Sequence, residues 1–176
     1  MGGIMKIQIC GYSGSGKSTL ARALGEKYNI PVLHMDSVNW YGNWQYRSDE
    51  EKTEIVNEFL SENESWVIDG NYLKICPQRF SECDLFILIQ FNRFYCFNKC
   101  YARYKKYKGM PRPDLPCGEK LDFEFAWWIL FEGRTRKRRK SFRLLAKNAK
   151  SALVFKSRRA LNRWLREEGI ALDLTK

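Results

Sequence analysis

The chain has 176 residues, a length typical of a single domain with a full hydrophobic core. Its 44% hydrophobic and 15% aromatic residues exclude a disordered chain, and no apolar run reaches the roughly 18 residues of a membrane span. The net charge of +11 indicates an anionic partner. No charged and then apolar leader is visible, so we expect a cytoplasmic location.

The first predicted element is a strand over residues 4–10, an apolar run of strand length. Residues 11–18 follow with the sequence GYSGSGKS, which fits the phosphate-loop pattern G-x-x-x-x-G-K-[ST]. A helix over residues 19–28 comes next. Strand, glycine-rich loop and helix together aim backbone N–H groups and a helix N-terminus at a phosphate. We therefore predict a nucleotide-binding set made of Gly11, Ser13, Gly14, Ser15, Gly16, Lys17, Ser18 and Thr19.

Aspartates follow the next two predicted strands. Residues 31–35 form a short apolar run that ends at Asp36, and residues 65–68 form another that ends at Asp69. Between them, Ser48 and Glu51 have the spacing of a capping box for a helix to about residue 63. Ligands of open α/β sheets bind beyond the carboxyl ends of the strands. We expect Asp69, with the Ser18 hydroxyl, to hold Mg²⁺, and Asp36 to meet the second substrate, although either aspartate could instead be a turn residue.

The second half of the chain contains two more strands. Residues 84–91 form the most apolar predicted strand, and its continuous apolar character favours burial on both faces. Residues 152–155 form the fifth strand. Helices are expected over 93–108, 119–132, a basic stretch up to about 149, and 158–168, with an irregular Pro/Gly-rich excursion at 109–116. Strands alternating with helices predict an α/β domain with a parallel sheet.

Charge is divided unevenly between the two halves. Residues 1–91 carry a net −4 and residues 92–176 a net +15. The segment 108–139 combines an irregular tip with arginines, including Arg112, Arg134 and Arg138. Phosphoryl transfer depends on positioning and on stabilising negative charge, so this segment is predicted to be a lid whose Arg134 and Arg138 join Lys17 and Asp36 in catalysis. A solvated basic helix is the alternative for any one arginine.

The six cysteines include no C-x-x-C pair, and His34 is the only histidine. A zinc site is therefore not expected, and the cysteines are predicted to be buried, reduced thiols.

The motifs HMD (34–36), DGNY (69–72), RPD (112–114) and EKLD (119–122), together with the phosphate loop, Arg93 and the basic run 134–140, resemble the bacterial DNA-topology-modulation (FlaR-type) proteins. These are relatives of adenylate kinase and other small P-loop kinases. The resemblance covers nearly the whole chain. It implies a five-stranded parallel sheet of order 2-3-1-4-5 with a lid, contacts of Asp36 and Arg93 with the acceptor, and lid arginines that close on ATP. Asn71 and Arg79 are further candidates for the acceptor site.

The sequence thus predicts an ATP- and Mg²⁺-dependent kinase acting on a nucleotide, a nucleoside or another small acceptor. The alternative is a basic DNA-binding, topology-modulating protein whose P-loop binds ATP as a regulator, although no DNA-binding motif is visible. A third reading is an ATPase or GTPase switch. The base-reading motif Asn-Lys-x-Asp that a resemblance to GTPases would require does not occur.

Overall fold

A single parallel sheet forms the centre of the protein. The computed structural model describes residues 4–42, 44–108, 110 and 114–172. Its five strands pair in parallel in the order β2-β3-β1-β4-β5, which confirms the predicted fold class and strand order. Their bounds are Lys6–Gly11 (β1), Val32–His34 (β2), Trp66–Asp69 (β3), Leu85–Ile89 (β4) and Ala152–Phe155 (β5).

The burial of the strands follows their place in the sheet. The three central strands, β1, β3 and β4, are almost completely buried, whereas the edge strands β2 and β5 are partly exposed. A strand covered by helices on both faces loses the alternation of polar and apolar residues, which explains the continuous apolar run of β4. The hydrophobic core lies on both faces of these central strands.

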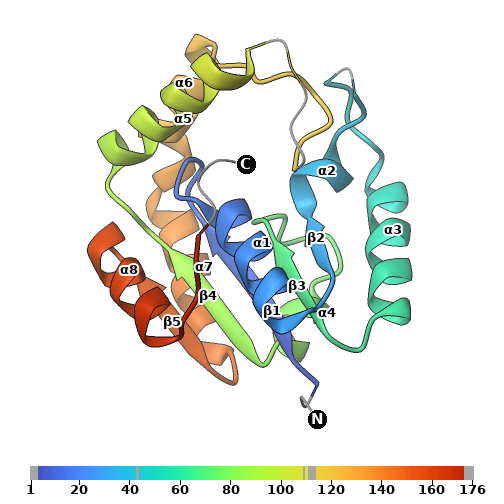
Figure 1. The fold of residues 1–176 in the computed structure, drawn as a ribbon. Coiled ribbons are helices and arrows are strands. Elements are labelled where there is room, and N and C mark those ends of the chain that lie inside the picture. Colours follow the sequence, from blue (N-terminus) through green and yellow to red (C-terminus); the bar gives the residue numbers. More distant parts are fainter. Residues whose placement is uncertain (1–3, 43, 109, 111–113, 173–176) are drawn as a thin grey trace.

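Helices cover both faces of the sheet (Figure 1). Helices α1 and α8 lie on one face, and α4 and α7 lie on the other. The longer helices are α1 (Lys17–Tyr28), α3 (Asp49–Glu62), α5 (Arg93–Tyr107), α7 (Arg136–Asn148) and α8 (Arg158–Glu167). The shorter ones are α2 (Met35–Asn39), α4 (Gln78–Glu82), α6 (Phe123–Leu130) and a 3₁₀ turn (Glu132–Arg134).

Helix boundaries agree with the sequence where a capping residue marks them. The side chain of Ser48 accepts from the backbone N–H of Glu51, and the Glu51 carboxylate accepts from the N–H of Ser48, so the predicted capping box is present. The helix expected over 119–132 begins only at Phe123. Asp122 caps it by accepting from the N–H of Phe125, and residue 119 instead pairs in parallel with residue 108.

All six cysteines are buried free thiols, as predicted. Within the described ranges, no helix combines the length and the apolar character needed to cross a bilayer.

The carboxyl ends of the strands meet at one edge of the sheet. The phosphate-loop segment follows β1 there, α2 follows β2, and Asp69 ends β3. Helices α5 and α6 rise beyond this edge on one side and α2 on the other (Figure 1). The sheet topology therefore brings together the sequence segments from which we predicted the site.

Candidate active site

Residues 11–18 form a tight loop between β1 and α1. Gly14 and Gly16 have left-handed φ values of 75° and 90°, and the N–H of Ser15 donates to the carbonyl of Tyr12 at 3.1 Å. A Cβ atom at Gly14 would lie 2.3 Å from the carbonyl oxygen of Cys96, so only glycine lets the loop pack directly on α5. This geometry is the strand–loop–helix arrangement that the sequence predicts.

The N-terminus of α1 faces this loop. Gly16 is the N-cap residue of α1 and has no side chain with which to cap the helix. The first N–H groups of α1 are therefore available to an anion, and the helix dipole favours negative charge there. Nζ of Lys17 donates to the carbonyl oxygen of Tyr12 at 3.3 Å, across the loop. The lysine charge and the helix N-terminus therefore lie on the same concave surface, where a nucleotide's phosphates are expected.

Asp69 is held on both of its carboxylate oxygens. It pairs with Ile9 of β1 in the sheet register and is 4% exposed. Oγ of Ser18 donates to Oδ2 of Asp69 at 2.9 Å, and His34 Nδ1 contacts Oδ1. Burial disfavours the charged form of His34, but the hydrogen bond to Asp69 and the Asp69 charge outweigh it and raise the histidine pKa.

Ser18 and Asp69 fit a magnesium ion. A hydroxyl oxygen and a carboxylate oxygen are hard ligands, and here they lie within 2.9 Å of each other beside the phosphate loop. Mg²⁺ is usually held by one or two protein oxygens, with phosphate oxygens and water completing an octahedron. The pair supplies the protein part of such a set, and a role in binding Mg²⁺ stays a prediction.

Asp36 lies in the first turn of α2 rather than in a loop. Helix α2 begins at Met35, directly after β2. The hydroxyl of Tyr72 donates to Oδ1 of Asp36 at 2.8 Å. Burial and the adjacent Asp36 carboxylate raise the pKa of Tyr72 well above its usual value, so the phenol keeps its proton and remains a donor. Asp36 is thus a half-buried carboxylate with a fixed orientation.

Asn71 and Arg79 stabilise the fold through hydrogen bonds within the protein. The side chain of Asn71 accepts from the N–H of Gly11 at 3.0 Å and donates to the Gly11 carbonyl at 2.9 Å, which braces the start of the phosphate loop. Arg79 has no exposed surface. Its guanidinium donates to Gln8 Oε1 at 2.7 Å and to the carbonyls of Tyr72 and Ile75. An acceptor cannot touch Arg79 in this conformation, so a structural role replaces the acceptor contact that we predicted for it.

Two predicted lid arginines lie close to the phosphate loop. Arg134 stacks on the ring of Tyr12, with its guanidinium carbon 3.8 Å from the ring centre, and donates to the carbonyls of Ile129 and Phe91. Arg138 lies 4.1 Å from the centre of the Trp128 ring. Both line a small recess with Ser13 and Asn71. Arg134 therefore also fastens the lid helices to the sheet, a role that the sequence did not indicate.

Arg93 and Arg158 complete the cationic surroundings. The exposed Arg93 guanidinium lies 5.5 Å from the centre of the Phe131 ring, and no contact of the described residues brings it to Asp36. A Cβ atom added at Gly16 would lie 3.7 Å from Nη1 of Arg158, so this guanidinium lies beside the phosphate loop. The sequence did not single out Arg158, because residues 133–166 contain 14 Lys and Arg residues with nothing to distinguish one from another.

Part of the predicted lid, residues 114–119, forms a strap across the site. Arg22 of α1 pairs with Asp114 at 3.8 Å, and Arg103 of α5 pairs with Glu119 at 2.8 Å. Sγ of Cys117 donates to the carbonyl of Tyr41 at 2.9 Å. The strap thereby connects α1 and α5 to the loop that follows α2. Arg112, predicted to act in the lid, lies outside the described residues.

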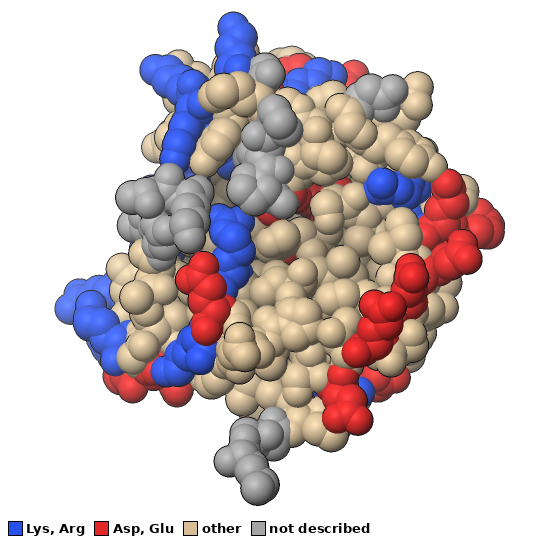
Figure 2. Space-filling view, turned by 45° about the vertical axis from the view of Figure 1, so that its right-hand side comes forward, with Lys and Arg blue, Asp and Glu red and all other residues tan. Residues whose placement is uncertain are grey.

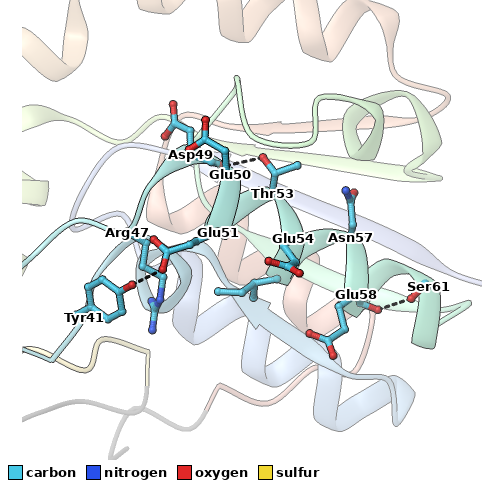
Figure 3. A pocket seen from close by; sticks show the side chains of 11 residues that line it. Tyr41, Arg47, Asp49, Glu50, Glu51, Thr53, Glu54, Asn57, Glu58 and Ser61 are labelled. Carbon is cyan, nitrogen blue, oxygen red and sulfur yellow. Dashed lines mark hydrogen bonds between the residues drawn. The ribbon is translucent and has the colours of Figure 1, made fainter.

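A wide surface hollow on α3 has the wrong charge for phosphate. Tyr41 and Arg47 border it, and the rest of its lining comes from α3, including five carboxylates (Figure 3). In Figure 3 the hydroxyl of Tyr41 points to Glu51, which ties the loop after α2 to α3. Anionic substrates would be repelled here, so the hollow is not part of the candidate site.

The sequence indicated the segments of the site but not the partners of each side chain. The sequence did not indicate that His34 would contact Asp69 or that Tyr72 would donate to Asp36. Their place at the end of β2 and just after Asp69 was the available signal, because both positions lie at the carboxyl edge of the sheet.

No protein-family model matches the sequence, and no curated protein matches it. Similar folds occur among solved structures. Shikimate kinase from Acinetobacter baumannii in complex with shikimate is 16% identical, with a TM-score of 0.58, over 94% of this chain and 93% of that one. Shikimate kinase from Bacteroides thetaiotaomicron is 17% identical, with a TM-score of 0.53, over 96% and 100%.

TT1252 from Thermus thermophilus is 18% identical, with a TM-score of 0.52, over 94% of this chain and 98% of that one. At these identities the likeness concerns the fold. It does not single out the DNA-topology-modulation proteins. The chain therefore shares its overall fold with these shikimate kinases.

Proposed function

We propose that the protein transfers the γ-phosphoryl group of ATP to a small acceptor, with Mg²⁺ as the cofactor. The observation that carries the proposal is the meeting of three segments at one edge of the sheet. The phosphate loop with Lys17 follows β1, Asp69 from β3 contacts Ser18, and Asp36 from α2 is oriented by Tyr72. Two structural neighbours are shikimate kinases, which supports this interpretation at the level of the fold.

Each side chain has a distinct role in this proposal. The loop N–H groups and Lys17 bind the β- and γ-phosphates and stabilise the negative charge of the transition state. Mg²⁺ bound at Ser18 and Asp69 would neutralise charge on the phosphate oxygens. Asp36 orients the acceptor or takes its proton, while Arg134 and Arg138 of the lid approach the phosphates from the side of α6 and α7.

The natural acceptor is best found by testing compounds of several classes. The panel includes shikimate, because two structural neighbours are shikimate kinases, together with nucleosides, nucleoside monophosphates and small sugars. ADP release is followed in a coupled assay with MgATP. Release that depends on one class of acceptor supports the proposal, and release that no acceptor accelerates contradicts it in favour of an ATPase switch.

A second candidate function is nucleic-acid binding regulated by ATP, as the resemblance to DNA-topology-modulation proteins suggests. The net charge of +15 on residues 92–176 favours it, with exposed basic residues on α7 and α8. Either function is proposed for the cytoplasm. The two functions differ in chemistry, because only the kinase forms a phosphorylated small molecule.

A further inference from the structure

The loop after α2 carries three aromatic side chains that are packed on one another outside the core. We call Trp40, Trp44 and Tyr46 the aromatic platform. The rings of Trp40 and Tyr46 have centroids 3.9 Å apart and an interplanar angle of 31°, and the Trp44 ring meets Trp40 edge-on at 5.0 Å. Tyr46 is 67% exposed. None of the three belongs to the hydrophobic core cluster.

The platform is rigidly joined to the helix that carries Asp36. One guanidinium nitrogen of Arg47 donates to the carbonyls of Ser37, Val38 and Trp40, at 2.8, 3.0 and 2.8 Å, and so closes the C-terminal end of α2. The backbones of Trp40 and Tyr46 pair as an antiparallel bridge. The rings are therefore fixed relative to α2 before any ligand arrives.

The platform also lies near the catalytic side of α2. Tyr46 is close enough to Tyr72 to contribute to its raised pKa, after the larger effects of burial and of Asp36. Tyr72 in turn donates to Asp36. On the other side, the strap reaches the same loop through Cys117 and Tyr41. The platform thus lies near Tyr72, which orients Asp36, and the strap contacts the loop that carries the platform.

Exposed aromatic rings outside a core commonly serve binding, because their faces offer a large apolar area at a small cost in side-chain entropy. Because Tyr46 is 67% exposed, much of its ring is accessible to a flat ligand, beside the Lys52 ammonium, whose Nζ lies 5.8 Å from the ring centre. Anionic or purely aliphatic ligands would gain little from such a surface, whereas a heterocyclic base gains stacking energy whatever its identity.

We propose that the aromatic platform binds a planar, unsaturated ring of the phosphate acceptor, so that the acceptor is a nucleoside or a nucleoside monophosphate. This inference rests on the proposed kinase function. For a nucleoside, the sugar hydroxyl oxygen bonds to the γ-phosphorus, the bond from that phosphorus to the β–γ bridging oxygen breaks and releases ADP, and the hydroxyl proton passes to Asp36. For a monophosphate, a phosphate oxygen attacks in the same way and no proton need be removed.

The test measures binding apart from turnover. Nucleosides, nucleoside monophosphates, ribose and shikimate are titrated by calorimetry into the full chain with a non-hydrolysable ATP analogue already bound, so that the phosphate-loop side is filled. Three variants are compared with the wild type: Tyr46→Ala removes the exposed ring, Tyr46→Phe keeps it, and Tyr101→Ala removes an exposed tyrosine ring on α5, outside the lid segment.

We expect nucleosides or monophosphates to bind at least tenfold more tightly than ribose or shikimate. Tyr46→Ala should weaken that binding about tenfold, as expected for the loss of one stacking partner. Tyr46→Phe should stay within about twofold of the wild type because it keeps the ring, and Tyr101→Ala should do so because its ring lies outside the platform. Equal binding by Tyr46→Ala and the wild type, or preferred binding of shikimate, overturns the inference.

The same samples separate this inference from the kinase proposal. If ADP release depends on an acceptor without a planar ring, the kinase stands and the aromatic site is wrong. If base binding depends on Tyr46 but no phosphoryl group is transferred, the kinase is wrong and the platform remains a binding site for bases.

Discussion

At the scale of single residues, the two aspartates of the site have different partners and therefore suit different tasks. Asp69 uses both oxygens, on Ser18 and His34, and is nearly inaccessible. Asp36 is half-buried, and the contacts of the described residues engage only its Oδ1, through Tyr72. A carboxylate whose two oxygens both have partners is held in place, as a metal ligand requires. A carboxylate with one oxygen left for a ligand suits contact with a substrate.

Replacing Asp36 with Asn keeps its shape and removes its charge. If the acceptor is a hydroxyl compound whose proton passes to Asp36, kcat should fall about 10²-fold or more with little change in acceptor KM. If the acceptor is a monophosphate, which needs no base, acceptor KM should rise and kcat should be preserved. Steady-state kinetics with the acceptor varied at saturating ATP distinguishes the two. If neither parameter changes, Asp36 is only a structural residue of α2.

Arg79 should matter for stability and not for acceptor affinity. Lysine cannot reproduce its three hydrogen bonds to Gln8, Tyr72 and Ile75, and burial already lowers the pKa of Arg79 to about 10. We expect Arg79→Lys to lower the free energy of unfolding by about 2–3 kcal/mol, because buried polar groups lose partners. Chemical denaturation measures this loss. A selective rise in acceptor KM at unchanged stability would restore the acceptor role.

At the scale of elements, the strap is a part of the lid that contacts three other segments, namely α1, α5 and the loop after α2. The Arg103–Glu119 pair of the strap and the Lys120–Asp122 pair just after it differ in burial. The Glu119 side chain is 3% exposed, whereas the side chains of Lys120 and Asp122 are 62% and 34% exposed. Buried pairs lose more than exposed pairs when one partner is removed, because the remaining charge is left in a poorly solvated place.

Breaking the buried pair should loosen the strap. We expect Arg103→Met to cost about 1–3 kcal/mol in the free energy of unfolding and to raise acceptor KM more than ATP KM, since the strap reaches the loop after α2. Lys120→Met, the matched control, should change stability by a few tenths of a kcal/mol. Similar effects of the two substitutions on acceptor KM would show that the strap takes no part in the site.

The sequence predicted the elements that carry strong local signals. Strand β4 is a continuous apolar run, β3 is apolar up to Asp69, and α3 begins at a capping box. Helices α2 and α4 have five residues each, too few for apolar residues to recur at helical spacing. Packing on the sheet therefore decides their conformation. Tyr72 lies 36 residues from Asp36, and Gln8 lies 71 residues from Arg79, so only the sheet topology brings the members of each pair together.

At the scale of the whole molecule, charge is divided between opposite sides. Acidic residues gather along one flank of the molecule and Lys and Arg along the other (Figure 2). The acidic flank includes α3, with Asp49, Glu50, Glu54 and Glu58, and the basic half includes α7 and α8. Such a field draws anionic ligands to the basic side and repels them from α3.

This charge division predicts weak, sequence-independent binding of duplex DNA. Counterion release drives such binding, so it should weaken steeply as salt rises from about 50 to 200 mM. Saturating MgATP should compete with DNA if both use the arginines near the phosphate loop. Fluorescence anisotropy with two unrelated duplexes measures both effects. Salt-resistant binding to one sequence would favour the DNA-binding function.

The central claim is that the phosphate loop supports transfer of the γ-phosphoryl group to a small acceptor. The most direct measurement follows radiolabel from γ-labelled ATP into an acceptor product, with wild-type protein and with Lys17→Ala. We predict a labelled small-molecule product that requires Mg²⁺, formed at a rate that falls about 10²–10³-fold in the variant while its circular dichroism and melting temperature are retained. Equal product formation by the wild type and a folded Lys17→Ala variant would contradict the account.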